Sequence, residues 1–562
     1  MIRAPLRSLS LLPLLAVLAC GGASREAADG GTDATGGTMI AVVPAEPTTL
    51  LPPLVTSAQG GAVVAALFDR LADIGPALET YGDMGFEPRL AMSWRWAPDS
   101  MSIAFALDPA ARWHDGAPVR AADVRFTYRA YTSDSVGAEG RSLLGNIDSV
   151  SVADSMTAVF WFKRRTPQQF YDATYHMWIL PSHLLDTVPL SRLGESSFAR
   201  QPVGTGRFRF ARWDPGQRIE LVADTANARG RARLDRVIWS IVPDFGAATM
   251  KLFAGEADFF EMIRPDNFAQ VARTPTLRLV DNRALAYNFL ALNFRDPRAL
   301  SRPHPIFSEV PVRRALTMAI DRERLVRNVF DSLGVVALAP APRALIPDTG
   351  ALRPLPYDPA AARALLDSAG WRDGDGDGFR ERNGAALAFE ILVPNSSASR
   401  QRYAVLLQEQ YRAIGVKATP LVLDVNALVA RIDRHTFDAY LGGWGTSPGL
   451  VGLRQTWASS GAANSSAYSS RAFDALLDSA LTTFDASRSR GYWARAFQQA
   501  IDDVAAVWLY EQRTPVAIHR RFIVPPLRPD GWSANLADWR VDPAQRIDRD
   551  RIGLGGPVGA KR

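Results

Sequence analysis

The stretch WHDGAPVRAADVRFTYRAY, residues 113–131, carries the clearest structural signal in this sequence. Asp115 and Gly116 are residue types that accept tight-turn geometry, so a turn is predicted at their positions. Asp123 stands where the apolar periodicity of a helix begins, and its carboxylate is expected to cap that helix by accepting backbone N–H groups. A turn followed by a capped helix describes architecture, so this stretch points to a fold rather than to a ligand.

On both sides of this stretch, short apolar runs typical of strands alternate with helical patterns, which indicates an α/β fold. No segment repeats at a fixed period, which argues against solenoids and propellers. Strands are predicted over residues 39–43, 102–107, 150–163 (with a turn inside), 218–224, 236–242 and 386–394, and helices over residues 62–74, 246–254, 311–331, 358–370, 399–413, 425–433, 471–484 and 486–504.

Length and composition describe an ordinary globular protein with more than one core. A chain of 562 residues is too long for a single hydrophobic core, so two or three domains are expected. The net charge of +6 comes from 64 Lys+Arg against 58 Asp+Glu, and the arginines are scattered among acids without a long basic run. Nucleic-acid binders concentrate positive charge in a patch or arm, so nucleic acid is not expected as a partner.

The first residues predict export and lipid anchoring. Arginines precede an apolar run in residues 1–19, which is typical of a secretion signal, and the run is too short to span a bilayer. Cys20, the only cysteine, follows Val-Leu-Ala, which resembles the bacterial lipobox, where the cysteine thiol is lipidated. The alternative is a chance cysteine, but a lone exported thiol has no disulfide partner. Residues 20–38, rich in Gly, Ala, Ser, Thr and Asp, are then expected to form a flexible tether.

The loop WRDGDGDGFRERNG, residues 371–384, looks like a calcium-binding EF-hand loop but lacks its strongest ligand. Asp373, Asp375 and Asp377 occupy the first ligand positions, whereas position 12, which needs a bidentate glutamate, is Gly384. A helix is predicted before the loop and a strand after it, in place of the two helices of an EF-hand. We therefore expect no cofactor and no functional metal, with these aspartates as the calcium candidates.

The pentapeptide GTSPG, residues 445–449, matches the Gly-x-Ser-x-Gly pattern of the nucleophile in α/β-hydrolases. In such enzymes the backbone N–H of the residue after the serine helps to stabilise the oxyanion. Here that residue is Pro448, which has no N–H. The six histidines are dispersed and show no zinc-binding spacing. A secreted serine hydrolase using Ser447 therefore stays an alternative only, and no enzymatic activity is expected.

Four stretches, in this order, resemble the bacterial extracellular solute-binding proteins of family 5, the oligopeptide- and dipeptide-binding proteins of ABC importers. The first contains the Trp-His-Asp-Gly motif, the second begins PVGTGRFRF, and the third ends in VRRALTMAIDRERLV. The resemblance covers nearly the whole chain from residue 39 onward, including the loop of residues 371–384. The stretches are residues 86–131, 202–224, 290–326 and 437–477.

The resemblance implies an α/β fold of two lobes, the periplasmic binding protein type II-like fold, with an extra small domain inserted in the first lobe. It also implies that ligand is enclosed between the lobes by hinge closure. The expected domains are lobe I over residues 39–75, 200–289 and 510–550, the inserted small domain over residues 76–199, and lobe II over residues 290–509.

The ligand contacts implied by the resemblance centre on Trp444. Peptide-binding members resemble one another in a tryptophan followed three residues later by an aspartate, which pairs with the peptide's α-ammonium, but this chain has Ser447 there. A buried ammonium without a carboxylate is costly, so either another acid, such as Glu46 or Asp438, replaces it or the ligand has no free N-terminus there. The predicted ligand-binding residues are Trp444, Ser447, Tyr440, Asn464, Tyr468, Trp508 and Glu46.

We therefore expect a substrate-binding lipoprotein of an ABC importer, lipid-anchored to a bacterial membrane on its periplasmic or extracytoplasmic side. Its expected role is to capture a small solute, with a peptide as the first choice, and to deliver it to the permease subunits. A sugar, an opine or a metal chelate stays open as the ligand, because the family handles such solutes as well. The chain is expected to act as a monomer that touches the membrane only through its lipid.

Overall fold

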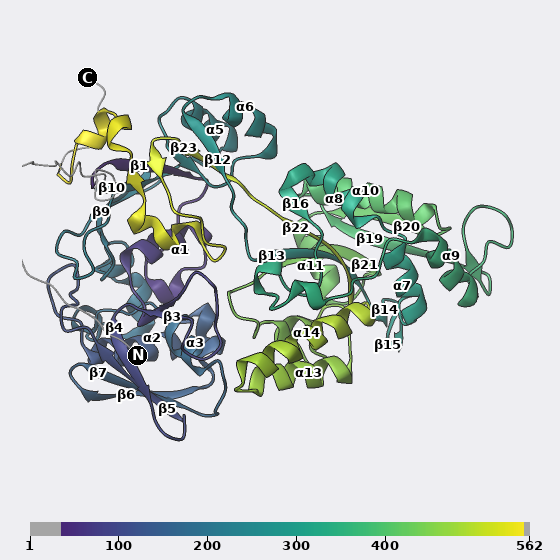
Figure 1. The fold of residues 1–562 in the computed structure, drawn as a ribbon, viewed down its shortest axis with the longest axis horizontal. Coiled ribbons are helices and arrows are strands. Elements are labelled where there is room, and N and C mark those ends of the chain that lie inside the picture. The colour runs from purple at the N-terminus through teal and green to yellow at the C-terminus, as the bar shows by residue number, and fades with distance from the viewer. Residues whose placement is uncertain (1–34, 556–562) are drawn as a thin grey trace, which may run out of the picture. The chain divides into compact units, whose positions relative to one another are not determined.

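The computed structural model describes residues 35–555, which belong to one compact unit. The predicted signal of residues 1–19, the predicted lipidation site Cys20 and the tether as far as residue 34 lie outside the described residues. Within the described part, no helix combines the length and the apolar character needed to cross a membrane. Two large mixed sheets and a smaller antiparallel sheet organise the unit (Figure 1).

The first large sheet is built around the apolar strand that follows the tether. Its seven strands lie in the order β12 (Leu277–Val280), β23 (Val516–His519), β11 (Phe259–Phe260), β1 (Thr38–Val43), β10 (Arg236–Ile241), β9 (Arg218–Ala223) and β8 (Phe208–Asp214). β1 pairs in parallel with β10 and β11, and its residues are almost all buried, as expected for a central strand. The accompanying helices are α1 (Ala58–Leu67), α5 (Phe245–Phe253) and α6 (Phe268–Arg273).

The second large sheet has its own hydrophobic core. Its six strands lie in the order β16 (Gly334–Val335), β22 (Ala506–Gln512), β13 (Ala286–Leu292), β21 (Ala439–Gly445), β19 (Ala388–Pro394) and β20 (Lys417–Leu423). Its helices are α7 (Val310–Met318), α8 (Arg322–Phe330), α9 (Pro359–Ser368), α10 (Ala398–Arg412), α11 (Val425–Asp433), α12 (Leu453–Trp457), α13 (Arg471–Thr482) and α14 (Ala486–Asp502). The last two pack side by side (Figure 1).

The smaller sheet is antiparallel throughout and lies within the range predicted for the inserted domain. Its strands follow the order β4 (Ala91–Trp96), β5 (Ser102–Leu107), β7 (Thr157–Phe162) and β6 (Ile147–Asp154), with helices α2 (Ala121–Thr132), α3 (Gln169–Thr174) and α4 (Ser182–Leu185). Buried aromatic rings fill its core, and the Phe105 ring lies 5.5 Å from Phe160 and 5.6 Å from Phe170. Four two-stranded pairs complete the sheets: β2 (Ala72–Ile74) with β3 (Phe86–Pro88), β14 (Arg295–Asp296) with β15 (Ala299–Pro303), β17 (Glu381–Arg382) with β18 (Ala385–Ala386), and β24 (Phe522–Ile523) with β25 (Arg540–Val541).

The domain boundaries predicted at residues 289/290 and 509/510 fall inside strands. β13 and β22 belong wholly to the second sheet, because their ladder pairs residues 288–291 with residues 506–510. The chain therefore passes between the two large sheets at residues 281–285 and 513–515. The division into lobes and an inserted domain stays a prediction.

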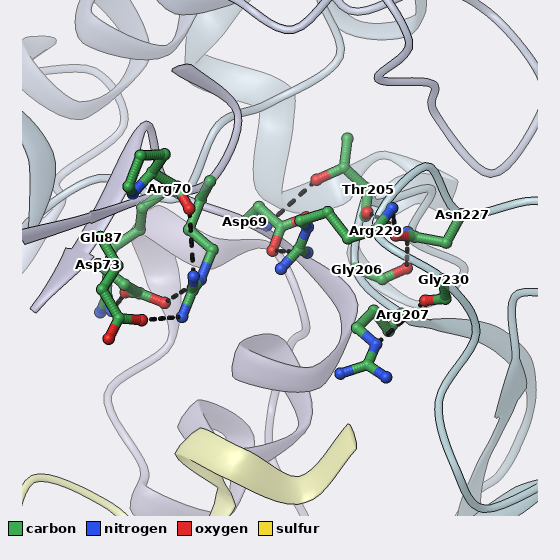
Figure 2. Close-up of polar contacts among 12 residues, drawn as sticks. Asp69, Arg70, Asp73, Glu87, Thr205, Gly206, Arg207, Asn227, Arg229 and Gly230 are labelled. Carbon is green, nitrogen blue, oxygen red and sulfur yellow. Dashed lines mark hydrogen bonds and ion pairs between the residues drawn. The ribbon is translucent and has the colours of Figure 1, made fainter. Parts of the chain in front are cut away.

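The helix predicted over residues 62–74 is wrong at its end. α1 stops at Leu67, and residues 72–74 form the strand β2. The backbone N–H of Asp69 donates to the Thr205 hydroxyl at 3.2 Å, a contact from a distant part of the chain (Figure 2). The Asp69 N–H therefore has a hydrogen-bond partner outside the helix. The helix can end at this point although the apolar spacing continues beyond it.

The helix predicted over residues 311–331 is two helices, α7 and α8. Asp321 separates them, because its carboxylate accepts the N–H of Arg324 at 2.9 Å and so starts a new helix. The apolar positions continue at helical spacing across Asp321. The apolar pattern alone therefore does not show that one helix ends and another begins there.

Asp123 caps α2 as predicted, from the first turn of the helix itself. Its Oδ2 accepts the N–H of Arg120 at 2.8 Å and the Trp113 indole N–H at 3.2 Å. Its Oδ1 accepts the backbone N–H and the hydroxyl of Ser182 at 2.8 and 2.6 Å. One buried carboxylate therefore joins the turn, the helix start and α4.

The Trp-His-Asp-Gly motif and the PVGTG segment form one hydrogen-bonded unit. His114 Nε2 donates to the Gly206 carbonyl at 2.9 Å, and Nδ1 accepts the N–H of Gly204 at 3.1 Å. The backbone N–H of His114 donates in turn to the Gly204 carbonyl at 2.9 Å. Burial lowers the pKa of His114, which favours the neutral ring that this donor and acceptor pattern requires.

The segment of residues 371–384 follows α9 and contains β17, which pairs with β18 as a hairpin, so a strand and not a second helix follows the acidic turn. Its aspartate carboxylates are exposed and lie within 4.8 Å of one another. Asp373 accepts two backbone N–H groups of the loop, at 2.8 and 3.1 Å, which accounts for the acidic turn as local structure. The expectation of no functional metal at Asp373, Asp375 and Asp377 stays a prediction.

Candidate ligand-binding site

A cavity of about 850 Å³ lies between residues 142–176 and segments that belong to the second large sheet and its helices. Its volume falls within the range of roughly 300–1,000 Å³ that is typical of small-ligand sites. The first wall comes from the segments before β6 and after β7, together with α3. The second wall comes from Tyr287, residues 341–345, residues 444–456 and the end of α13.

The strand β21 presents an open backbone edge at this cavity. One edge of β21 pairs with β13 along its whole length. The other edge pairs with β19 only at Ala439 and Tyr440, so in the described part of the chain residues 441–445 have no strand on that side. Trp444 and Gly445 line the cavity. The peptide groups of this edge can therefore accept a further strand.

The first wall contains buried polar atoms without a protein partner. Asn146 donates from Nδ2 to the Arg164 carbonyl at 3.1 Å, but its Oδ1 accepts no hydrogen bond from the described residues. The Oε1 of Gln168 likewise has no partner among residues 35–555. Because buried polar atoms in folded proteins are almost always hydrogen-bonded, these two acceptors suit a ligand or water with N–H or O–H groups.

Some of the charged side chains that line the cavity form ion pairs within the protein, and others do not. Arg454 and Asp478 form an ion pair with each other. Arg164 and Asp172 also line the cavity, and within residues 35–555 neither of them forms an ion pair. The cavity therefore contains one carboxylate and one guanidinium that are not neutralised by the described protein.

Aromatic rings lie on the same wall as Asp172. The Tyr171 ring stacks on Tyr175 at 4.9 Å and meets the edge of His176 at 4.8 Å. Burial, together with the positive charge of Arg70, lowers the pKa of His176 to about 3, so this ring is neutral near pH 7. Burial raises the pKa of Asp172 to about 7. The wall thus combines neutral rings with one carboxyl group that ionises near neutral pH.

Of the residues predicted to bind ligand, Trp444 and Ser447 line this cavity. Trp444 is half-buried and lies opposite Tyr287 in the pairing of β21 with β13. Ser447 is exposed, is followed by Pro448 and has no histidine hydrogen-bonded to its hydroxyl within residues 35–555. The geometry therefore offers no histidine base, and position 448 offers no backbone N–H for the oxyanion of a serine nucleophile.

The other predicted contacts from the second large sheet and its helices are engaged in the hydrophobic core there. The hydroxyl of Tyr440 meets Ser465 Oγ at 2.7 Å, and Asn464 donates to the Tyr468 carbonyl at 2.7 Å. The Tyr468 hydroxyl donates to the Asp503 carboxylate at 2.7 Å, and the ring of Trp508 packs among other aromatic rings. None of these residues lines the cavity, so the cavity gives them no support as ligand contacts.

The acids named as substitutes for the missing aspartate are also engaged elsewhere. Glu46 accepts the indole N–H of Trp213 at 2.6 Å. Asp438 accepts the backbone N–H of Glu390 at 2.9 Å. Neither lines the cavity, whereas Asp172, which the sequence did not single out, does.

Comparisons of the sequence and of the structure with known proteins all lead to the same family. Residues 85–465 match the bacterial extracellular solute-binding proteins, family 5 Middle. The oligopeptide-binding protein AppA of Bacillus subtilis is 29% identical over 414 residues, which cover 72% of this chain and 75% of that protein. The structure of AppA in complex with a nonapeptide has a TM-score of 0.71 at 26% identity, over 91% of this chain and 100% of that chain. HbpA2 from Haemophilus parasuis shares the fold, with a TM-score of 0.76 at 23% identity over 90% of this chain and 100% of that chain.

The matched region includes the Trp-His-Asp-Gly motif, most of both cavity walls and the open edge of β21. The α/β fold of two large sheets agrees with the solved structures of the family. The relatives are binding proteins, which supports the expectation that this chain binds a solute and does not transform it. Motifs, fold and sequence match lead to the same conclusion: this chain belongs to the bacterial extracellular solute-binding proteins of family 5.

Proposed function

We propose that this protein is the substrate-binding lipoprotein of an ABC importer, that its ligand is a peptide, and that it delivers this peptide to the permease. The observation that carries the ligand class is the open edge of β21 beside the cavity. An extended peptide along residues 441–445 gains backbone hydrogen bonds whatever its side chains are. The nonapeptide complex of AppA supports the same ligand class.

The remaining features of the cavity suit a peptide as well. Trp444 supplies an apolar face for a side chain, while Asn146 and Gln168 offer acceptors for peptide N–H groups or for water. Both signs of uncompensated charge are present, which matches a ligand with an ammonium and a carboxylate. A sugar offers no charge for these groups, so the cavity favours a peptide over a sugar.

The ligand class is tested on the mature protein carrying Cys20→Ser, which removes the thiol that lipidation needs. Native mass spectrometry of the purified protein identifies any copurified ligand, and the refolded protein is then screened by thermal shift. The probes are di- to pentapeptides, sugars and metal chelates. A peptide at 100 times its dissociation constant is expected to stabilise the protein by about 2.7 kcal/mol. A response to sugars or chelates alone, with none to peptides, overturns the ligand class and leaves the family unchanged.

Lipid anchoring gives a separate prediction. The wild-type protein is expected to sediment with the membrane fraction of the producing cell, because an acylated Cys20 inserts its chains into the bilayer. Cys20→Ser is expected to move the protein into the soluble extracytoplasmic fraction, since no helix of residues 35–555 crosses a membrane. Fractionation with immunoblotting measures this change, and mass spectrometry of the N-terminal peptide detects the lipid. Equal membrane association of both forms contradicts the anchor.

A further inference from the structure

Asp172 is a carboxylate that the described protein leaves uncompensated. It lies on α3 and lines the cavity, and no Lys, Arg or His of residues 35–555 forms an ion pair with it. The other cavity acid, Asp478, is neutralised by Arg454. Its side chain is only partly buried, so the carboxylate stays accessible from the cavity, where a ligand can supply the missing partner.

The groups around Asp172 do not supply the missing charge. On the same wall, His176 is neutral near pH 7, and the rings of Tyr171 and Tyr175 carry no charge there. Arg70 lies over the Tyr175 ring at 4.3 Å, but its guanidinium pairs with Asp73 at 3.0 Å. Burial accordingly raises the pKa of Asp172 to about 7, with no opposing charge to lower it.

Asp172 is also placed to replace the aspartate that peptide-binding relatives have at the position of Ser447. Both residues line the same cavity, but they come from opposite walls. A cation held in the cavity can therefore meet a carboxylate from the first wall instead of the second. On that wall, Asn146 Oδ1 and Gln168 Oε1 also have no partner within the described residues.

We infer that Asp172 is the recognition residue for a cationic group of the ligand, which is the α-ammonium when the ligand is a peptide. This inference rests on the proposed function and sharpens it. The Asp172 carboxylate then has an ion-pair partner only when ligand is bound. The unpaired carboxylate destabilises the empty protein, and ligand binding removes this destabilisation. Ligands whose amine is blocked are then discriminated against.

The test uses free and N-acetylated versions of one pool of di- to pentapeptides, with the mature Cys20→Ser protein as the reference. The peptide that binds the reference most tightly is measured by calorimetry against Asp172→Asn and against Asp186→Asn. Asp186 is a matched control, because it is an exposed carboxylate paired with Arg129 at 3.4 Å and does not line the cavity. Asp172→Glu tests whether the charge alone restores binding.

Acetylation is expected to weaken binding to the reference about tenfold or more, and Asp172→Asn is expected to weaken binding of the free peptide equally. Acetylation should then cause no further loss in Asp172→Asn, whereas Asp186→Asn should behave as the reference does. Equal affinity of the reference and Asp172→Asn for the free peptide overturns the inference and leaves peptide binding intact. Failure of the reference to bind either pool overturns the proposed ligand class, and the inference with it.

A second measurement needs no ligand. The pKa of Asp172 in the folded protein lies above its unfolded value of 3.8, so folding is favoured at low pH and this contribution is lost as pH rises from about 4 through about 7. Asp172→Asn removes the ionisation and should raise the melting temperature of the empty protein by about 2 °C or more at pH 8. The gain should be smaller at pH 5. A gain that is absent, or the same at both values, shows that the carboxylate is already compensated and overturns the inference.

Discussion

Replacing Arg521 with methionine is expected to lower the free energy of unfolding by about 3–5 kcal/mol, because it leaves buried carboxylates without their main cation. The side chains of Arg521 and Asp258 are 0% exposed. Arg521 donates to Asp258 at 2.7 Å, to the Asp550 carboxylate at 3.1 Å and to the Thr38 carbonyl at 3.1 Å. Arg549 remains beside Asp258 in the variant, which keeps the loss within this range.

The network is important because it joins three parts of the chain at the centre of the first sheet. Thr38 begins β1, Asp258 precedes β11, and Asp550 lies near the C-terminal end of the described residues. Asp258 also accepts the N–H of Ile40 at 2.9 Å, so its position fixes the start of the central strand. A methionine cannot donate any of these hydrogen bonds.

Urea unfolding followed by tryptophan fluorescence measures the effect. Arg192→Met is the control, since Arg192 and Glu195 form an exposed ion pair in which both side chains are more than 60% accessible. Loss of such a pair is expected to change stability by less than about 0.5 kcal/mol. A loss below about 1 kcal/mol for Arg521→Met contradicts the role given to the network.

Elements with local signals were predictable from the sequence. The helix predicted over residues 425–433 coincides with α11, because Asp424 caps it by accepting the N–H groups of Asn426 and Ala427 at 3.0 Å. The start of α9 at Pro359 follows equally from the aspartate before it. Caps and turns act within four residues, so one sequence contains the whole cause.

Features produced by distant segments were not predictable in this way. The end of α1 depends on Thr205, which is 136 residues away from the N–H that it accepts. The residues around Asp172 read FYDATYH and contain no motif. Asp172 becomes a candidate only once the fold places residues 444–456 opposite it across the cavity. Trp444 and Ser447 were predicted because a family resemblance marks their positions, whereas no resemblance marked Asp172.

The second large effect is expected for Gly204→Ala, which should lower the free energy of unfolding by about 3 kcal/mol or more. A Cβ at Gly204 would lie 1.9 Å from the Leu67 carbonyl oxygen and 3.2 Å from the His114 ring. The nearest atoms are backbone, so the clash is relieved only by moving the end of α1 away from the PVGTG segment, which breaks the hydrogen bond that the Gly206 N–H donates to the Leu67 carbonyl at 2.8 Å. The glycine is therefore required by close approach of two chain segments.

The matched control is Gly61→Ala on α1 itself. Nothing lies within 4 Å of a Cβ at Gly61, and alanine favours a helix interior over glycine by about 0.5–1 kcal/mol. The same substitution is therefore expected to stabilise the protein at one position and to destabilise it at the other, as measured by thermal and urea unfolding. Loss of soluble protein for Gly204→Ala agrees with the expectation provided that Gly61→Ala folds. Equal melting temperatures for the two variants contradict this expectation, because the contact with Leu67 then does not require glycine at position 204.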